Sequence, residues 1–185
     1  MKTKRMILRL LCLTFLLLGN NSYARDVIPN HLSSLLNYKQ FNTVTLPNAS
    51  VLYQSDDSRA RPLVDVTRDF IPRVLALTQF EEMEMCQDID LKIIIMSEGV
   101  LNNRSVMNFM TWDSLPRNGV YGAYDSFHDQ STGEIYISAF SSSSFFTKIL
   151  AHEFWHFVQD STCIPKTEEG AEEFANRYCT ITGDC

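Results

Sequence analysis

Residues 144–160 read SFFTKILAHEFWHFVQD, and this stretch decides how the C-terminal half of the chain folds. Its apolar residues recur at helical spacing and a serine stands at its start, so the pattern predicts one helix over Ser144–Asp160. His152 and His156 share one face of that helix because they are four positions apart, and Glu153 lies one position round. Two imidazoles that can reach one ion, with a carboxylate beside them, indicate a zinc site.

The next helix is expected to begin at Thr167, a good N-cap residue, and to run to about Thr180. A catalytic zinc ion takes three protein ligands and keeps one position for water. The third ligand can come from this second helix, which begins with a group of carboxylates: Glu168, Glu169, Glu172 and Glu173.

We choose Glu172 as the third ligand, because the chain must descend about as far after the first helix as it climbed past His156. Ala175 then allows close approach of the helices, and Asn176 can hydrogen-bond a ligand imidazole as an outer partner. Glu168, with Ala171 three positions later, is the alternate third ligand.

The rest of the chain alternates strands and helices. Residues 43–53 and 91–96 have the composition of strands, and apolar positions at helical spacing predict a long helix over 58–80. Two more strands, over 119–124 and 134–138, flank a stretch rich in turn residues and form a hairpin. The sequence therefore predicts an α+β fold.

The chain resembles a known group of enzymes. His-Glu-x-x-His from His152 to His156, with a downstream Glu-x-x-Ala on the next helix, is similar to the gluzincin zinc metallopeptidases, especially their small single-domain members. Gln159 and the Gly-Glu-Ile-Tyr-Ile strand at 133–137 are further shared features, and the likeness covers about residues 119–179. It implies a zincin fold, in which a twisted mixed sheet has a substrate-binding edge strand and packs on the active-site helix.

The chemistry of such a site can be stated from its residues. Zinc held by two neutral imidazoles and one carboxylate lowers the pKa of a bound water to about 7. Glu153 is then placed to act as general base and to pass the proton to the leaving amine. Hydrolysis of a peptide or protein substrate is the natural outcome, and an edge strand such as Glu134–Ser138 can pair with an extended peptide.

A partner for the developing oxyanion is also expected, and the sequence does not rank the candidates. They are Tyr121, Tyr124, Tyr136, Tyr178 and His128.

Residues 1–24 have the features of a cleavable signal peptide: a basic start, an apolar run from Leu10 to Leu18, and small residues before a predicted cut after Ala24. Nine mainly apolar residues are too few for a membrane span of about 20. We therefore expect a secreted or periplasmic protein with one domain over 25–185 and no stable membrane insertion. Residues 25–42 form a lead-in, which a propeptide role would also suit.

Charge and cysteine content fit export. Without the leader the chain has 12 Lys and Arg against 22 Asp and Glu, a net charge of −10, which argues against nucleic acid as a partner. Four cysteines remain, and they can form two disulfides by any of three pairings. These cysteines are Cys86, Cys163, Cys179 and Cys185.

A second function from a different class is a non-catalytic exported module, stabilised by zinc or by disulfides alone, whose surface binds a partner. Glu153 separates the two possibilities, because a structural zinc site has no use for a base and closes its fourth position with a protein ligand. The sequence favours the enzyme.

Overall fold

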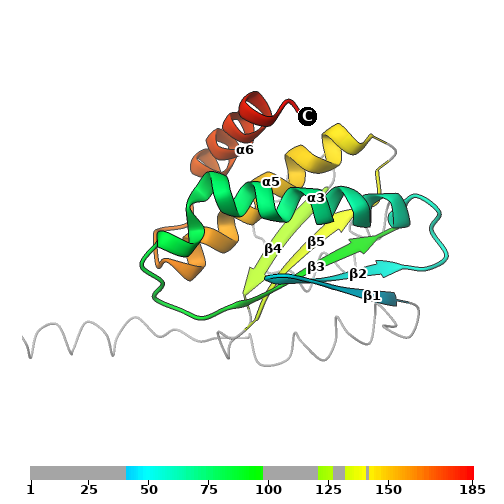
Figure 1. The fold of residues 1–185 in the computed structure, drawn as a ribbon, viewed down its shortest axis with the longest axis horizontal. Coiled ribbons are helices and arrows are strands. Elements are labelled where there is room, and N and C mark those ends of the chain that lie inside the picture. The colour runs from blue at the N-terminus through cyan, green and yellow to red at the C-terminus, as the bar shows by residue number, and fades with distance from the viewer. Residues whose placement is uncertain (1–40, 98–120, 127–131, 141) are drawn as a thin grey trace, which may run out of the picture.

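The computed structural model describes residues 41–97, 121–126, 132–140 and 142–185, which form a five-stranded mixed sheet with helices over one face (Figure 1). The strands are β1 (Phe41–Leu46), β2 (Ala49–Gln54), β3 (Asp90–Met96), β4 (Gly122–Ser126) and β5 (Thr132–Ser138). The helices are α3 (Ala60–Thr78), the short 3-10 helix η2 (Phe80–Glu82), α5 (Ser143–Ser161) and α6 (Glu168–Thr182).

The sheet has the order β1-β2-β3-β5-β4. Its three inner strands are parallel, and β1 and β4 pair antiparallel at the two edges. The predicted hairpin is confirmed for its described residues, with Tyr124 opposite Ile135. The expectation that Glu134–Ser138 lies at an edge is wrong, because β5 pairs with β3 on one side and β4 on the other. Within the described ranges the edge beside α5 belongs to β4.

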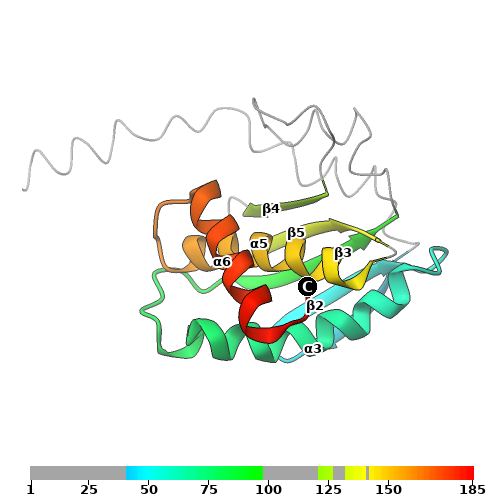
Figure 2. The ribbon, with the colours of Figure 1, turned by 90° about the horizontal axis from the view of Figure 1, so that it is seen from above.

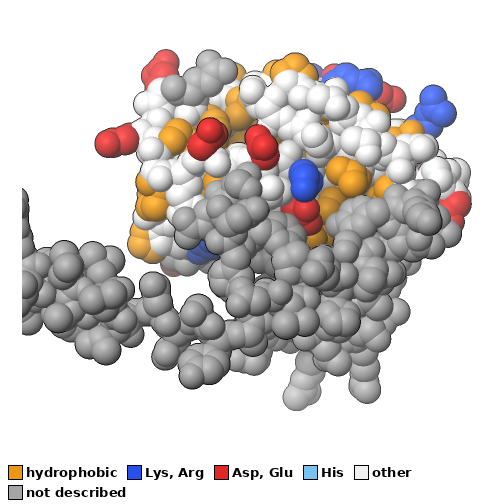
Figure 3. All heavy atoms as spheres, turned by 90° about the horizontal axis from the view of Figure 1, so that it is seen from below, with side chains coloured by type: hydrophobic (Ala, Val, Ile, Leu, Met, Phe, Trp, Pro, Cys, Tyr) orange, Lys and Arg blue, Asp and Glu red, His pale blue; other side chains and the backbone are white. Residues whose placement is uncertain are grey.

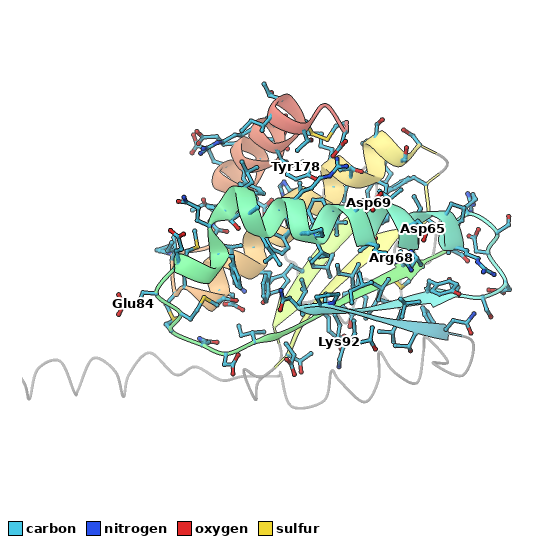
Figure 4. The ribbon with its side chains drawn as sticks, in the orientation of Figure 1. Asp65, Arg68, Asp69, Glu84, Lys92 and Tyr178 are labelled. Carbon is cyan, nitrogen blue, oxygen red and sulfur yellow. A yellow bond between two sulfur atoms is a disulfide. The ribbon has the colours of Figure 1, made fainter. Side chains whose placement is uncertain are left out.

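Apolar side chains explain how the helices cover this sheet. Helix α3 lies over β2 and β3, α5 lies over β5 and β4, and α6 packs on α5 (Figure 2). The ring of Phe70 in α3 contacts Phe154 of α5 at 5.9 Å and Tyr178 of α6 at 5.0 Å between centroids. Figure 4 shows Tyr178 between α6 and α3. All three helices therefore meet in one core.

The opposite face of the sheet carries a polar group among buried residues. Lys92 Nζ lies 3.3 Å from Glu134 Oε1, and the Tyr136 hydroxyl donates to Glu134 Oε2. Lys92 points away from the helices in Figure 4. Figure 3 views the molecule from this side, where the basic and acidic side chains in view are mixed in sign.

The predicted helices and strands are confirmed, with small differences at their ends. Helix α5 begins at Ser143 because the Ser142 side chain accepts the Phe145 N–H, and Thr167 caps α6 as expected by accepting from Gly170. Our predictions for residues 1–24 and for 25–40 of the lead-in lie outside the described residues, and the last two residues of the lead-in, Phe41 and Asn42, belong to β1. No described helix is both long and apolar enough to cross a bilayer.

All four predicted cysteines are paired, which is typical of proteins in an oxidising environment. The disulfides join Cys86 to Cys163 and Cys179 to Cys185. The first links two segments 77 residues apart, and the second closes the end of α6.

Candidate metal centre

Helix α5 places two imidazoles on its face towards α6. Phe154, Phe157 and other apolar residues of α5 turn into the core, which orients the helix. His152 and His156 follow one another along the remaining face with ring centroids 5.1 Å apart. His156 is buried and His152 is half-buried, so neither ring is fully hydrated.

The first turn of α6 brings a carboxylate to both rings. Glu168 Oε2 lies 3.2 Å from His152 Nε2, and Glu168 Oε1 lies 3.5 Å from His156 Nε2. The side chain of Glu168 is 86% exposed, so it closes the site from the solvent side. His152, His156 and Glu168 each offer one ligand atom, and these atoms lie within 4.8 Å of one another.

This donor set fits a zinc ion. Zinc bonds of about 2.0–2.1 Å in a tetrahedral arrangement separate two ligand atoms by about 3.3 Å. The observed separations of 3.2 and 3.5 Å between the imidazole nitrogens and the carboxylate oxygens are close to that value. Burial lowers the pKa of His156 against the opposing charge of Glu168, which favours the neutral, metal-binding form of this imidazole.

Glu168, our alternate third ligand, is the carboxylate that lies against both imidazoles, whereas Glu172, our first choice, lies farther out. The connection before α6 folds back onto the end of α5, because the Ile164 N–H donates to the Gln159 carbonyl and Gln159 Nε2 donates to the Pro165 carbonyl. A residue one turn into α6 is therefore not needed to reach the level of the imidazoles. The first residue of α6 thus already lies beside the imidazoles.

Glu172 occupies an outer position instead. Its Oε1 accepts from Lys148 Nζ at 2.9 Å and from Asn176 Nδ2 at 3.1 Å, and the Lys148 bond lowers its pKa. Its Oε2 lies 3.7 Å from His152 Nδ1. Asn176, which we expected to hydrogen-bond a ligand imidazole, instead donates its amide N–H to Glu172 in this structure.

Gln159 is a further site residue, which the sequence indicated only as a feature shared with the gluzincin group. Its Oε1 lies 3.1 Å from His156 Nδ1, while its amide nitrogen bonds Pro165. Both Nδ1 atoms thus face a side-chain oxygen, from Gln159 or Glu172, and both Nε2 atoms face Glu168. Outer contacts of this kind fix the tautomer and the direction of a metal-binding imidazole. The spacing of three residues between His156 and Gln159 on one helix was the sequence signal that could have indicated this contact.

Glu153 lies beside the imidazoles and against the edge strand. It is 8% exposed and accepts a hydrogen bond from the backbone N–H of Tyr124 in β4. Burial, followed by the charge of Glu168, raises the pKa of Glu153 to about 8. A Cβ at Gly122 would lie 2.5 Å from Ile149 and 3.0 Å from Glu153, so glycine lets the strand approach α5 here.

The tyrosines considered for the oxyanion have other contacts. The Tyr124 hydroxyl donates to Asp160, and that of Tyr136 donates to Glu134. Tyr178 is buried between helices and its hydroxyl lies 3.5 Å from Asp184. Tyr121 packs against two phenylalanine rings. His128 lies outside the described residues.

Packing and a disulfide hold α6 in this position. Trp155 stacks on Phe174 with ring centroids 4.6 Å apart. Gly170 allows close approach, because a Cβ there would lie 2.8 Å from Thr167 Oγ1 and 3.4 Å from Gln159 Nε2. Cys163 in the α5–α6 connection has φ of 55° and is bonded to Cys86. The disulfide therefore restrains the segment that delivers Glu168.

Comparisons of the chain with protein-family models, with curated proteins and with solved structures gave no match. The geometry of the site thus carries the functional argument by itself.

Replacing single glutamates of α6 tests the ligand set by zinc titration. Glu168→Ala should weaken zinc binding on the order of 1,000-fold, because it removes a direct ligand. Glu172→Ala should weaken it by about tenfold, because it removes an outer contact. The exposed neighbour Glu169 is the matched control, and Glu169→Ala should bind as the parent does. Undiminished binding by Glu168→Ala, together with loss in Glu172→Ala, would reverse our assignment.

The two disulfides can be compared in the same assay. Removing the first disulfide, by Cys86→Ser with Cys163→Ser, should lower the free energy of unfolding by about 4 kcal/mol. Removing the second, by Cys179→Ser with Cys185→Ser, should lower it by about 2 kcal/mol, because the second disulfide closes a much shorter loop. Only the first pair should also weaken zinc binding in protein that is still folded. Equal zinc affinity in both variants would mean that the Cys86–Cys163 bond does not position Glu168.

Proposed function

We propose that this chain is an exported zinc-dependent metallopeptidase of the gluzincin type. The observation that carries the proposal is the convergence of His152, His156 and Glu168, with the buried carboxyl of Glu153 at the next helix position. The sheet order supports it, because a mixed sheet with an edge strand beside the histidine-bearing helix is what the resemblance to this group implies.

His152 Nε2, His156 Nε2 and Glu168 are the groups that would hold the ion. When bound there, zinc supplies a Lewis acid that polarises a carbonyl and acidifies water. Gln159 would keep the His156 imidazole directed at the ion through its Nδ1, and Glu172 lies on the corresponding outer side of His152, with 3.7 Å between its Oε2 and the His152 Nδ1. Neither the Gln159 nor the Glu172 side chain reaches the Nε2 side of the rings, so both lie outside the ligand set.

Glu153 is the general base of the proposed reaction. The ionised form of Glu153 acts: one carboxylate oxygen accepts the proton of the attacking water and then delivers it to the nitrogen of the scissile amide, so that the carboxylate is regenerated. The hydrogen bond from the Tyr124 N–H holds this carboxyl in place. Its position in the protein interior limits competing contact with bulk water.

The edge strand β4 provides a means of binding substrate. Within the described residues it pairs only with β5, and an extended peptide can pair along its other edge through backbone groups other than the Tyr124 N–H, which Glu153 already occupies. The same strand contacts Glu153 at Gly122 and Tyr124. A peptide paired with β4 would therefore pass close to the base.

The number of protein ligands in the group favours catalysis over a purely structural role. The group found in the described part of the chain has three members, whereas structural zinc sites normally use four protein ligands. Secretion or export to a periplasm is part of the proposal, through the expected leader 1–24. The two disulfides support such an environment.

The substitution Glu153→Gln tests the proposal. The variant should bind one zinc ion with parental affinity and lose cleavage of casein by at least about 1,000-fold, because the amide keeps the shape of the carboxyl but cannot take a proton. Glu173→Gln, at an exposed position of α6, is the matched control and should cleave normally. Zinc content measured with the cleavage rate decides the outcome: an active Glu153→Gln variant would remove the base from the mechanism.

A further inference from the structure

Three aromatic rings gather where β4 begins and α5 starts, and we call Tyr121, Phe140 and Phe145 the aromatic cluster. Their ring centroids are 4.8–5.5 Å apart. Tyr121 is 43% exposed and Phe145 is 40% exposed. Exposed apolar residues are ordinary when scattered, whereas these three rings contact one another at the surface.

The aromatic cluster is continuous with the candidate metal centre along α5. Phe145, Ile149 and His152 follow one another at spacings of four and three residues, so they share one helix face that continues to His156. Phe145 precedes His152 by seven residues, which is about 10 Å along the axis.

Strand β4 connects the same two places on its own side. Tyr121 directly precedes Gly122, whose backbone lies against Ile149 and Glu153. Two residues further on, the strand reaches Tyr124, whose backbone N–H donates to Glu153. The aromatic cluster and Glu153 therefore both lie along β4.

We propose that the aromatic cluster binds a large apolar side chain of an extended peptide whose backbone pairs with β4; this rests on the proposed function. A strand advances about 3.3 Å per residue, so 10 Å places that side chain about three residues from the scissile bond. The cluster thus selects substrates by a residue distant from the bond that is cut.

The size of the exposed surface argues for a single side chain as the occupant. An aromatic residue buries about 150–250 Å², and two rings that are each about 40% exposed offer an area of that order. A stable contact between folded proteins needs about 800 Å² from each partner. The cluster therefore fits one peptide side chain better than a second copy of this chain.

Peptide binding tests this without relying on cleavage. The probe is a fluorescein-labelled decapeptide of Gly, Ser and Ala with one Phe, compared with the same peptide carrying Ser in its place, on zinc-loaded Glu153→Gln protein. The Phe peptide should bind at least about tenfold more tightly in fluorescence anisotropy, since burying an aromatic side chain is worth that much. In the same background, Phe145→Ala or Tyr121→Ala should remove the difference, whereas Ile181→Ala, at a residue 57% exposed on α6, should not.

Cleavage of a peptide library by the parent protein gives the second measurement. Large apolar residues should be enriched about three residues from the cleaved bond, and Phe145→Ala should remove this enrichment while cleavage continues. If the parent cleaves nothing but the Phe peptide still binds through the cluster, the proposed function fails and the peptide site stands.

Several results would overturn the inference. Equal binding of the Phe and Ser peptides would do so, as would a preference that survives both cluster substitutions. Enrichment confined to the residues that flank the cleaved bond would contradict the stated distance. Finally, a dimeric parent protein that becomes monomeric in Tyr121→Ala, measured by sedimentation, would make the cluster a contact between copies.

Discussion

The candidate site depends on the packing of the first turn of α6 against α5. Glu168 lies on an exposed helix start, and it reaches two imidazoles only because the preceding connection folds back onto Gln159. Small residues make the approach possible, since Gly170 leaves room for the side chains of α5 and Ala171 is fully buried. If this contact moved by one helical turn, the carboxylate would be lost from the group.

The environment of each carboxylate separates its role from that of its neighbours. Glu168 is exposed and faces both imidazole Nε2 atoms, Glu172 is neutralised by Lys148, and Glu153 is buried against β4. A buried carboxyl with a raised pKa is costly for folding and common in functional sites, because it is kept ready to exchange a proton. The exposed Lys148–Glu172 pair contributes less than about 1 kcal/mol to stability, so its effect is mainly on orientation.

Much of this architecture could be predicted from the sequence, because helical spacing, capping residues and alternating strands are local signals. His152, Glu153 and His156 were identified this way, and so were the four paired cysteines. The sequence did not separate Glu168 from Glu172 as third ligand, because the two differ only by a turn and the path of the connection depends on hydrogen bonds to Gln159 that no local pattern encodes. The aromatic cluster escaped notice for a similar reason, since its three rings come from separate segments that only the fold brings together.

We propose that His152, His156 and Glu168 together hold one zinc ion. X-ray absorption spectroscopy at the zinc edge, on protein loaded with one equivalent of metal, tests this ligand set. We expect two imidazole nitrogens and oxygen ligands at about 2.0–2.2 Å with no sulfur. A shell that contains sulfur at about 2.3 Å, or one made of oxygen atoms without imidazole scattering, would contradict it.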